Sequence, residues 1–226
     1  MKNANPSLNP ANNGTLAGAL ETAFNKVMQG VSDMLPAKVI KFDRTANRVQ
    51  VQPLIAIVTT DESTVSRAQL ASLPVLQLGG GGFVLNFNLI PGDLGWIKAN
   101  DRDISLFLNS YKESKPNSNR LHSFSDAVFI PDVMTGYTIA GEDADNAVLQ
   151  SLDGTVKISL GIGKIKVSAP IVEIDGATNV AINSPAVFMT VSTGIAIDTP
   201  LLFVDGDIAA SGTITPGVLD DPNHSS

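Results

Sequence analysis

The residues best suited to acid–base chemistry are His122 and its neighbours Arg120 and Asp126. A histidine beside a carboxylate can act as a general base. Nucleophilic catalysis also needs a serine or cysteine held against that base, and we find no such setting and no second histidine near it. We therefore interpret His122 as a structural, hydrogen-bonding histidine, and a catalytic base is the alternative.

Four carboxylates in the C-terminal third of the chain could form another kind of acid–base pair. They are Glu173, Asp175, Asp198 and Asp205. Two carboxylates about 5–9.5 Å apart beside a groove hydrolyse glycosidic bonds, usually with aromatic platforms for the sugar. The large polar aromatic residues lie elsewhere, at Trp96, Tyr111 and Tyr137. The sequence therefore favours a protein that is not an enzyme, with a trimeric polysaccharide hydrolase as the alternative.

Phosphate and nucleic-acid chemistry are both disfavoured. The glycine run Gly79–Gly82 is not followed by the Lys-Ser or Lys-Thr pair of a phosphate-binding loop, and it joins two apolar segments, so we interpret it as a turn. The chain has 15 Lys and Arg against 22 Asp and Glu, a net charge of −7. Nucleic-acid binding needs basic clusters that this chain lacks. It has no cysteine, which excludes disulfides and cysteine-bound zinc.

The strongest pattern in the sequence is a fifteen-residue repeat between Ile165 and Ala210. Pro170, Pro185 and Pro200 mark its period, and the segments around them align without a gap. Within each repeat the apolar residues alternate in two short runs, which predicts two strands. The alternation slips by one residue at the proline, where the missing N–H and the fixed φ suit a corner.

One chain alone cannot bury these repeats. The few apolar side chains of each repeat contribute less free energy than the entropy lost when fifteen residues are ordered. Three identical chains wound around one axis would supply the missing apolar surface and leave no long sheet edge exposed. The repeat therefore predicts an intertwined, triple-stranded β-helix in a homotrimer. An antiparallel β-sandwich with a coincidental period is the alternative.

A helix is predicted near the N-terminus, after a polar segment rich in Asn and Pro. Thr15 can cap it, Glu21 lies near its start and Pro36 ends it. Its apolar residues recur at three- and four-residue intervals: Leu16, Leu20, Phe24, Val27, Met28, Val31 and Leu35. This face can pack on the adjacent β domain or on an assembly neighbour, and both remain open.

The sequence pattern in the middle of the chain, short apolar runs between turn residues, predicts an all-β domain. The expected strands are 39–43, 48–55, 73–76, 83–87, 95–98 and 104–108. Turns are expected at 44–47, at the glycine run and at Pro91–Asp93. Five or six short strands favour a small Greek-key barrel of the OB type. Asp143 and Asp145 are expected to solvate a loop, and Ala147–Ile162 to open the β-helix with a turn at Asp153-Gly154.

The barrel residues also carry a resemblance to a known family. The blocks concerned are Val49–Pro53, the glycine turn before Phe83, Leu89–Trp96, Asp101–Ile104 and Arg120–Pro131. Over residues 36 to about 133 the chain resembles the N-terminal OB domain of the central, membrane-piercing spike proteins of contractile phage tails. Members of that family continue into a three-chain β-helix, which the repeat predicts independently.

The resemblance implies a structural baseplate central spike that pierces the host cell envelope during tail contraction. The implied partners are two further copies of the chain, baseplate hub and tail-tube proteins and, transiently, the host outer membrane. Residues 1–13 do not resemble a signal peptide, and no apolar run approaches the roughly 20 residues that span a bilayer. We therefore expect assembly in the host cytoplasm and residence in the virion, in the tail baseplate. A polysaccharide-hydrolysing tailspike and the spike of a related contractile injection system are the alternatives.

The resemblance also bears on a metal at the tip. Many spikes of this family end in a His-X-His pair, so that a trimer offers six imidazoles to one iron ion. This chain has only His224 there. Three copies of His224 could still hold iron or zinc on the axis, but we expect no metal or other cofactor, because a terminal histidine is more often simply exposed. A separate tip protein could then dock on the blunt end.

These observations divide the chain into five parts. We expect an N-terminal tail and helix (1–36), an OB-fold domain (37–133), a linker (134–146), a β-helix spike (147–210) and a tip (211–226).

Overall fold

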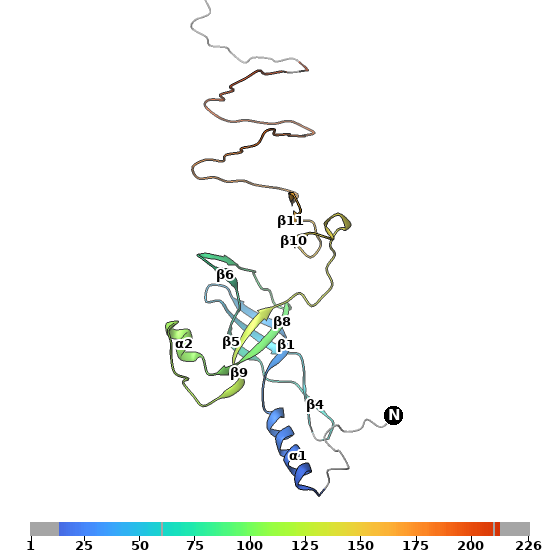
Figure 1. Ribbon diagram of the computed structural model, residues 1–226, viewed down its shortest axis with the longest axis vertical. Helices are drawn as coiled ribbons and strands as arrows, with labels where there is room; N and C mark the ends of the chain where they lie inside the picture. The colour runs from blue at the N-terminus through green and yellow to red at the C-terminus, as the bar shows by residue number, and fades with distance from the viewer. Residues whose placement is uncertain (1–13, 60, 210, 213–226) are drawn as a thin grey trace, which may run out of the picture. The chain divides into compact units, whose positions relative to one another are not determined.

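Helix α1 (Leu16–Gln29) opens the described part of the chain, which in this computed structural model comprises residues 14–59, 61–209 and 211–212 (Figure 1). The Thr15 side chain accepts a hydrogen bond of 3.1 Å from the Gly18 N–H, so the predicted N-cap is confirmed. The predicted end at Pro36 is wrong. Gly30 caps the helix, and Leu35 packs against the barrel core instead of continuing the apolar face of the helix.

Five antiparallel strands form the main sheet, in the order β5-β2-β1-β8-β9. The strands are β1 (Met34–Asp43), β2 (Arg48–Pro53), β5 (Leu70–Pro74), β8 (Leu94–Arg102) and β9 (Leu121–Pro131). The predicted turn at 44–47 joins β1 to β2, with Asn47 in the left-handed region at φ 50°. Alternation places every second residue of β2 and β8 in the interior, as the sequence pattern predicts.

The sheet curls until its two outer strands meet. Val75, just after β5, forms a parallel bridge with Phe129 of β9, and the Leu76 N–H donates to the Phe129 carbonyl at 2.8 Å. The core lies inside this nearly closed barrel: Ala37, Val39, Val49, Val51, Leu73, Val75, Leu89, Ile97, Ala127 and Phe129. The expected all-β class is confirmed for this part of the chain.

Residues 104–108, predicted as a strand, are helical. They fall in α2 (Ser105–Ser110), where the Ile104 carbonyl accepts from the Leu108 N–H at 3.0 Å. The Asp103 carboxylate accepts the Ser105 N–H at 2.9 Å, which satisfies a backbone donor at the helix start. Because the short apolar run has no partner strand, this local capping sets its conformation.

Two small hairpins interrupt the barrel strands. The pair β3 (Ile57–Val58) and β4 (Thr64–Val65) follows β2, and the pair β6 (Leu78–Gly80) and β7 (Phe83–Leu85) follows β5. The glycine run forms the turn of the second hairpin, as predicted, with Gly81 and Gly82 at positive φ. Its first strand begins at Leu78, later than the expected 73–76, because those residues already belong to β5 and the barrel closure.

A second sheet lies between residues 147 and 168. Its strands β10 (Ala147–Gln150), β11 (Lys157–Gly161) and β12 (Lys164–Ser168) pair in order, each antiparallel to the next. The predicted turn at Asp153-Gly154 is present, with Gly154 at φ 71°. A 3₁₀ turn, Gly141–Asp143, precedes the sheet, within the segment expected to be a linker.

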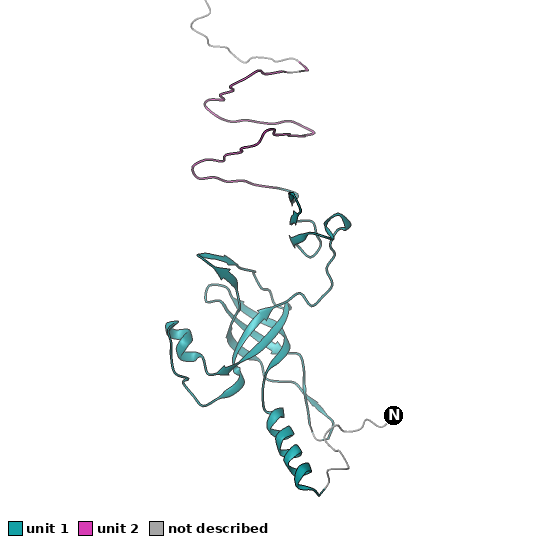
Figure 2. Cartoon of the chain, in the orientation of Figure 1, with its two compact units in different colours: residues 1–171 teal, residues 172–226 magenta. Residues whose placement is uncertain are grey.

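The chain divides into two units, residues 1–171 and 172–226 (Figure 2). The expected spike boundary at residue 147 therefore lies within the first unit. In the second unit, residues 172–209 form an open coil of successive wide turns (Figure 2). Residues 169–209 do not pair into strands within their own chain.

Candidate assembly interface

The sheet β10–β12 has one face that is apolar and uncovered. Leu149, Ile158 and Val167 lie side by side across its strands, and Ala147, Leu160 and Ile165 form the next row. Five of these six side chains are between 42% and 72% exposed: Leu149, Ile158, Leu160, Ile165 and Val167. We call these six residues the open face.

The opposite face of the same sheet is polar and covered. Lys157 and Ser159 of β11 point to it and are only 8% and 1% exposed. The Lys157 ammonium pairs with the Asp143 carboxylate, which is 2% exposed, and lies 3.3 Å from the Glu142 carboxylate. The Asn146 side chain donates to Ser159 Oγ at 2.9 Å. Residues 142–146 thus cover the polar face of the sheet.

The charges on the covered face stabilise one another. A hydrogen bond from Lys157, helped by Ser159, lowers the pKa of Asp143 to about 2. The same hydrogen bond raises the pKa of Lys157. Hydrogen bonds from Lys166 and Lys157 lower the pKa of Glu142. The buried charges are therefore fully paired, as burial requires.

This polarity is the reverse of an ordinary surface sheet, which buries its apolar face and exposes its polar one. The chain's own polar loop already occupies the polar side, and no described residue of the same chain covers the open face. An uncovered apolar sheet of this kind is typical of an interaction surface.

The repeat continues the open face in sequence register. Ile165 and Val167 of β12 occupy the repeat positions of Val180 and Ile182, fifteen residues later, and of Ile195 and Ile197 after fifteen more. These four later residues are also exposed, between 55% and 65%. β12 is thus both the third strand of the sheet and the first strand segment of the repeat.

The predicted proline corners are confirmed. The chain bends at residues 170, 185 and 200, and again at 177–178 and 192–193. At two of the proline corners a hydroxyl closes the bend: Ser184 Oγ donates to the Ala186 carbonyl at 2.6 Å, and Thr199 Oγ1 to the Leu201 carbonyl at 3.0 Å. Equivalent bonds at equivalent positions show that the two repeats share one local structure.

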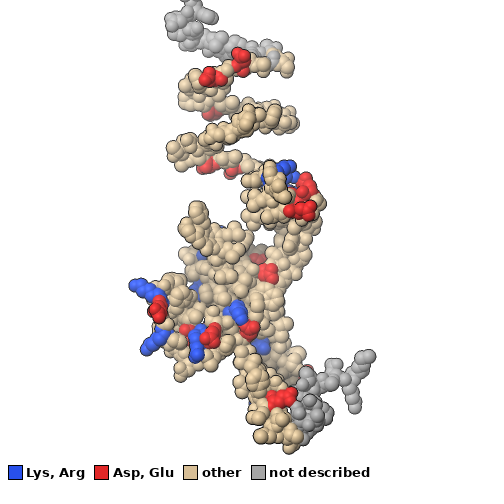
Figure 3. Space-filling model, in the orientation of Figure 1, with Lys and Arg blue, Asp and Glu red and all other residues tan. Residues whose placement is uncertain are grey.

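The four carboxylates of the repeat are not held by other side chains as a catalytic acid–base pair. Glu173, Asp175, Asp198 and Asp205 are all exposed. The stretch 167–226 contains no Lys or Arg, and Figure 3 accordingly shows acidic but no basic side chains on the described part of the second unit. These carboxylates make the described part of the repeat acidic.

Arg120 organises the polar cluster near His122. Its guanidinium binds Asp126 through two hydrogen bonds of 3.0 and 2.9 Å and Asp103 through one of 3.0 Å. Hydrogen bonds from Ser105 and Ser118 lower the pKa of Asp103 to about 2, with a smaller contribution from Arg120. Hydrogen bonds and the charge of Asp126 raise the pKa of Arg120. Both carboxylates are buried and committed to this cluster.

His122 lies apart from that cluster. Its Nε2 is 3.3 Å from the Asp101 carboxylate, and its side chain is 42% exposed. Its backbone sits in the left-handed region at φ 44°, next to the register shift between β8 and β9, and its carbonyl accepts the Ser32 N–H at 3.0 Å. Through these contacts, His122 links the segment before β1 to strand β9.

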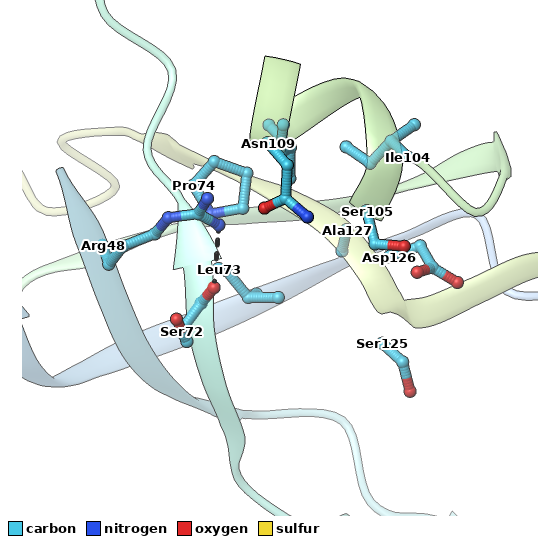
Figure 4. A pocket seen from close by; sticks show the side chains of 11 residues that line it. Arg48, Ser72, Leu73, Pro74, Ile104, Ser105, Asn109, Ser125, Asp126 and Ala127 are labelled. Atoms are coloured by element: carbon cyan, nitrogen blue, oxygen red, sulfur yellow. Dashed lines mark hydrogen bonds between the residues drawn. The ribbon is translucent and has the colours of Figure 1, made fainter. Parts of the chain in front are cut away.

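A pocket of about 300 Å³ lies between α2, the start of β2, the end of β5 and the middle of β9 (Figure 4). Arg48, Asn109 and Asp126 are among its polar residues. The Arg48 guanidinium donates to the Ser72 carbonyl at 3.1 Å, and Asp126 is held by Arg120. Because its charged groups are already paired within the protein, the pocket offers no free acid–base pair.

The metal expectation concerns His224, which lies outside the described residues. Within the described ranges, no group of three or more His, Asp or Glu side chains is arranged to hold a metal ion. Across the same ranges, no helix is long and apolar enough to cross a membrane.

The barrel boundaries coincide with a known domain. Residues 35–132 match the family model of the phage protein Gp138 N-terminal domain. The match spans β1 to β9 and supports a phage structural protein. It ends before β10, so it does not describe the open face or the repeat. No curated protein matches the chain at a significant level.

Sequence reasoning missed the Asp143–Lys157 pair. Asp143 was expected to solvate a turn, but it is buried against β11. A signal was available in the alternation of residues 156–160, where Lys157 and Ser159 alternate with apolar residues. That alternation predicts a sheet with one polar face, although it cannot name the carboxylate that covers it.

Proposed function

We propose that this protein is the structural central spike of a phage tail baseplate, that it acts as a homotrimer and that it is not an enzyme. The observation that carries the proposal is the uncovered open face of β10–β12, which continues in register into the fifteen-residue repeat. The match of the barrel to a phage protein domain supports the viral context.

Three copies of the open face can cover one another around a common axis. Each copy contributes a three-stranded sheet whose polar side is closed by its own loop, so only the apolar side is available for contact. Three such sheets facing inward enclose an apolar prism and expose polar loops to water. The repeat would extend this prism, with Val180 and Ile182 and then Ile195 and Ile197 as its next layers.

Hydrogen bonding also favours intertwined chains. The extended backbone of residues 169–209 forms no ladder within one chain, although buried N–H and C=O groups need partners. Strands of neighbouring copies would supply these partners at each level of the coil. The resulting β-helix has no independent edge strand, so force along its axis loads many hydrogen bonds together and unfolding is slow.

The barrel would serve as the adaptor to the rest of the tail. Its strand order, closed between β5 and β9, supports a five-stranded barrel of the OB type. Some of its charged groups are held in internal pairs, such as Arg120 with Asp103 and Asp126. In this proposal the barrel binds hub and tail-tube proteins. The repeat forms the part of the spike that contacts the host envelope. A polysaccharide-hydrolysing tailspike gains no support from the exposed carboxylates of the repeat.

Solution mass tests the proposal directly. The full chain is expected at three times its mass of 23.6 kDa at micromolar concentration. Ile165→Asp places three charges on the open faces and should abolish the trimer. Lys164→Asp, the adjacent residue on the opposite side of β12, is the matched control and should leave the trimer intact. A wild-type monomer, or a trimer that tolerates Ile165→Asp, would overturn the proposal.

A further inference from the structure

Helix α1 presents an apolar face that no described residue of its own chain covers. Leu16, Leu20, Phe24, Val27 and Met28 are between 48% and 78% exposed, although they recur on one side of the helix. A helix of fourteen residues is marginal in water without tertiary packing. The packing that stabilises α1 must therefore come from outside the described part of its chain.

The segment after the helix is attached firmly to the barrel. The Ser32 N–H donates to the His122 carbonyl at 3.0 Å, and the Ala99 N–H donates to the Asp33 carbonyl at 2.8 Å. The Asp33 carboxylate also pairs with the Lys98 ammonium. The short connection between α1 and β1 is thus held by three contacts, which limits the freedom of the helix to reach another surface of its own chain.

The spacing of the exposed residues indicates what covers them. Ala17, Leu20, Phe24 and Val27 of the helix follow one another at intervals of three, four and three, which is the a/d pattern of a coiled coil. Within the helix the pattern covers about one and a half heptads, which is too short to hold chains together alone but sufficient when another interface already raises the local concentration. A partner with the same spacing is needed, and the chain's own copies have it.

The charges on the helix also favour a second copy of α1 as the partner of this face. The helix carries one acidic and one basic residue, Glu21 and Lys26, and neither occupies an a or d position. Identical copies therefore approach along this seam without like-charge repulsion, whereas a strongly charged groove on another protein would find no complementary charge there.

We propose that the apolar face of α1 binds the α1 helices of two further copies of this chain, forming a short parallel three-helix coiled coil. This inference rests on the proposed trimer and adds a second, helical interface at the other end of the first unit's sequence. Phe24 and Val27 occupy its centre, and Lys26 lies outside it.

Single cysteines test the inference, because the natural chain has none. In full-length protein, Phe24→Cys and Leu20→Cys place thiols on the seam, and Lys26→Cys is the matched control outside it. After mild oxidation, the two seam variants should give mostly covalent dimers on a non-reducing gel, at least fivefold more than Lys26→Cys. Native mass of each variant, measured before oxidation, reports the trimer separately.

The outcomes distinguish this inference from the proposed function. A trimer in which neither seam variant cross-links, or in which Lys26→Cys cross-links equally well, overturns the coiled coil and leaves the spike trimer standing. A monomer overturns both. Cross-linking at Phe24 and Leu20 should be lost when Ile165→Asp is added, because the short helices associate only when the open faces hold the chains together. Cross-linking that persists would overturn that dependence.

Discussion

Asp143 and Lys157 form a buried ion pair on the side of β11 opposite the open face. The pair joins the loop before the second sheet to the middle strand of that sheet. Because it closes the polar side, it leaves the apolar side as the surface that a neighbouring copy can cover. The polarity of the sheet, and hence the position of the proposed trimer axis, depends on this pair.

Removing one partner of the pair should lower the stability of the folded protein more than removing both partners. Lys157→Met leaves the Asp143 carboxylate buried without its cation, whereas Lys157→Met with Asp143→Leu leaves an apolar contact. We expect the single variant to have the lower thermal unfolding midpoint, by several degrees. Circular dichroism measures both midpoints. Asp145→Asn, at an exposed neighbouring position, is the control and should behave as wild type. Equal midpoints for the single and double variants would contradict the paired arrangement.

Acid should destabilise the protein through two carboxylates. The pKa values of Asp103 and Asp143 are lowered from 3.8 to about 2 in the folded protein. A lowered pKa contributes stability that is fully present above the ordinary value and is lost as the pH falls through the folded value. We therefore expect the urea midpoint to be unaffected by these groups at pH 5–7 and to fall between about pH 4 and pH 2. The slope should be shallower in Asp143→Asn, and an unchanged slope would show that Asp143 does not contribute.

The barrel should not tolerate a side chain at Gly95. A Cβ there would overlap the Ile130 carbonyl oxygen and the Phe129 ring, both in the neighbouring strand β9. We expect Gly95→Ala to lower the free energy of unfolding by about 1–3 kcal/mol, as overpacking does. Gly136→Ala is the control, because its Cβ would meet open space at an ordinary φ. Denaturant unfolding compares the two, and a stable Gly95→Ala variant would mean that β8 and β9 pack less closely than described.

The repeat should fail to assemble when an inward residue becomes charged. Val187→Asp or Ile182→Asp would bury three unpaired carboxylates around one axis, so we expect no trimer by native mass. Phe188→Asp, next to Val187, and Phe203→Asp, the equivalent position in the next repeat, serve as controls because both have the opposite parity to Val187. If the controls abolish the trimer and the first two variants do not, the inward face carries Phe188 and Phe203 instead.

No metal is expected at the tip. Three copies of His224 offer only three imidazoles to iron or zinc, because the sequence lacks the second histidine of a His-X-His pair there. Elemental analysis of trimer purified without a histidine tag should therefore find less than a tenth of an ion per trimer. One ion per trimer, lost in His224→Ala and on acidification below the imidazole pKa of about 6.5, would refute this expectation.

Several features could be read from residue order because they depend on neighbours along the chain. The proline corners, the glycine hairpin, the turns at 44–47 and 153–154 and the Thr15 cap each arise from local dihedral preferences or hydrogen bonds over a few residues. The alternation in β2 and β8 likewise identified the buried face of each strand. Local physics was sufficient for all of them.

Other features depended on contacts between residues distant in sequence. Leu35 could continue a helical stripe or begin a strand, and its packing against the barrel core selects the strand. Residues 104–108 were expected to pair as a strand, but residues from Ser105 onward form α2, and the Asp103 carboxylate accepts the Ser105 N–H at its start. Lys157 becomes buried because Asp143 reaches it across fourteen residues, and Arg120 joins two carboxylates from separate segments. These features depend on the free energy of contacts between residues distant in sequence. A pattern of neighbouring residues does not contain that information, so it could not predict them.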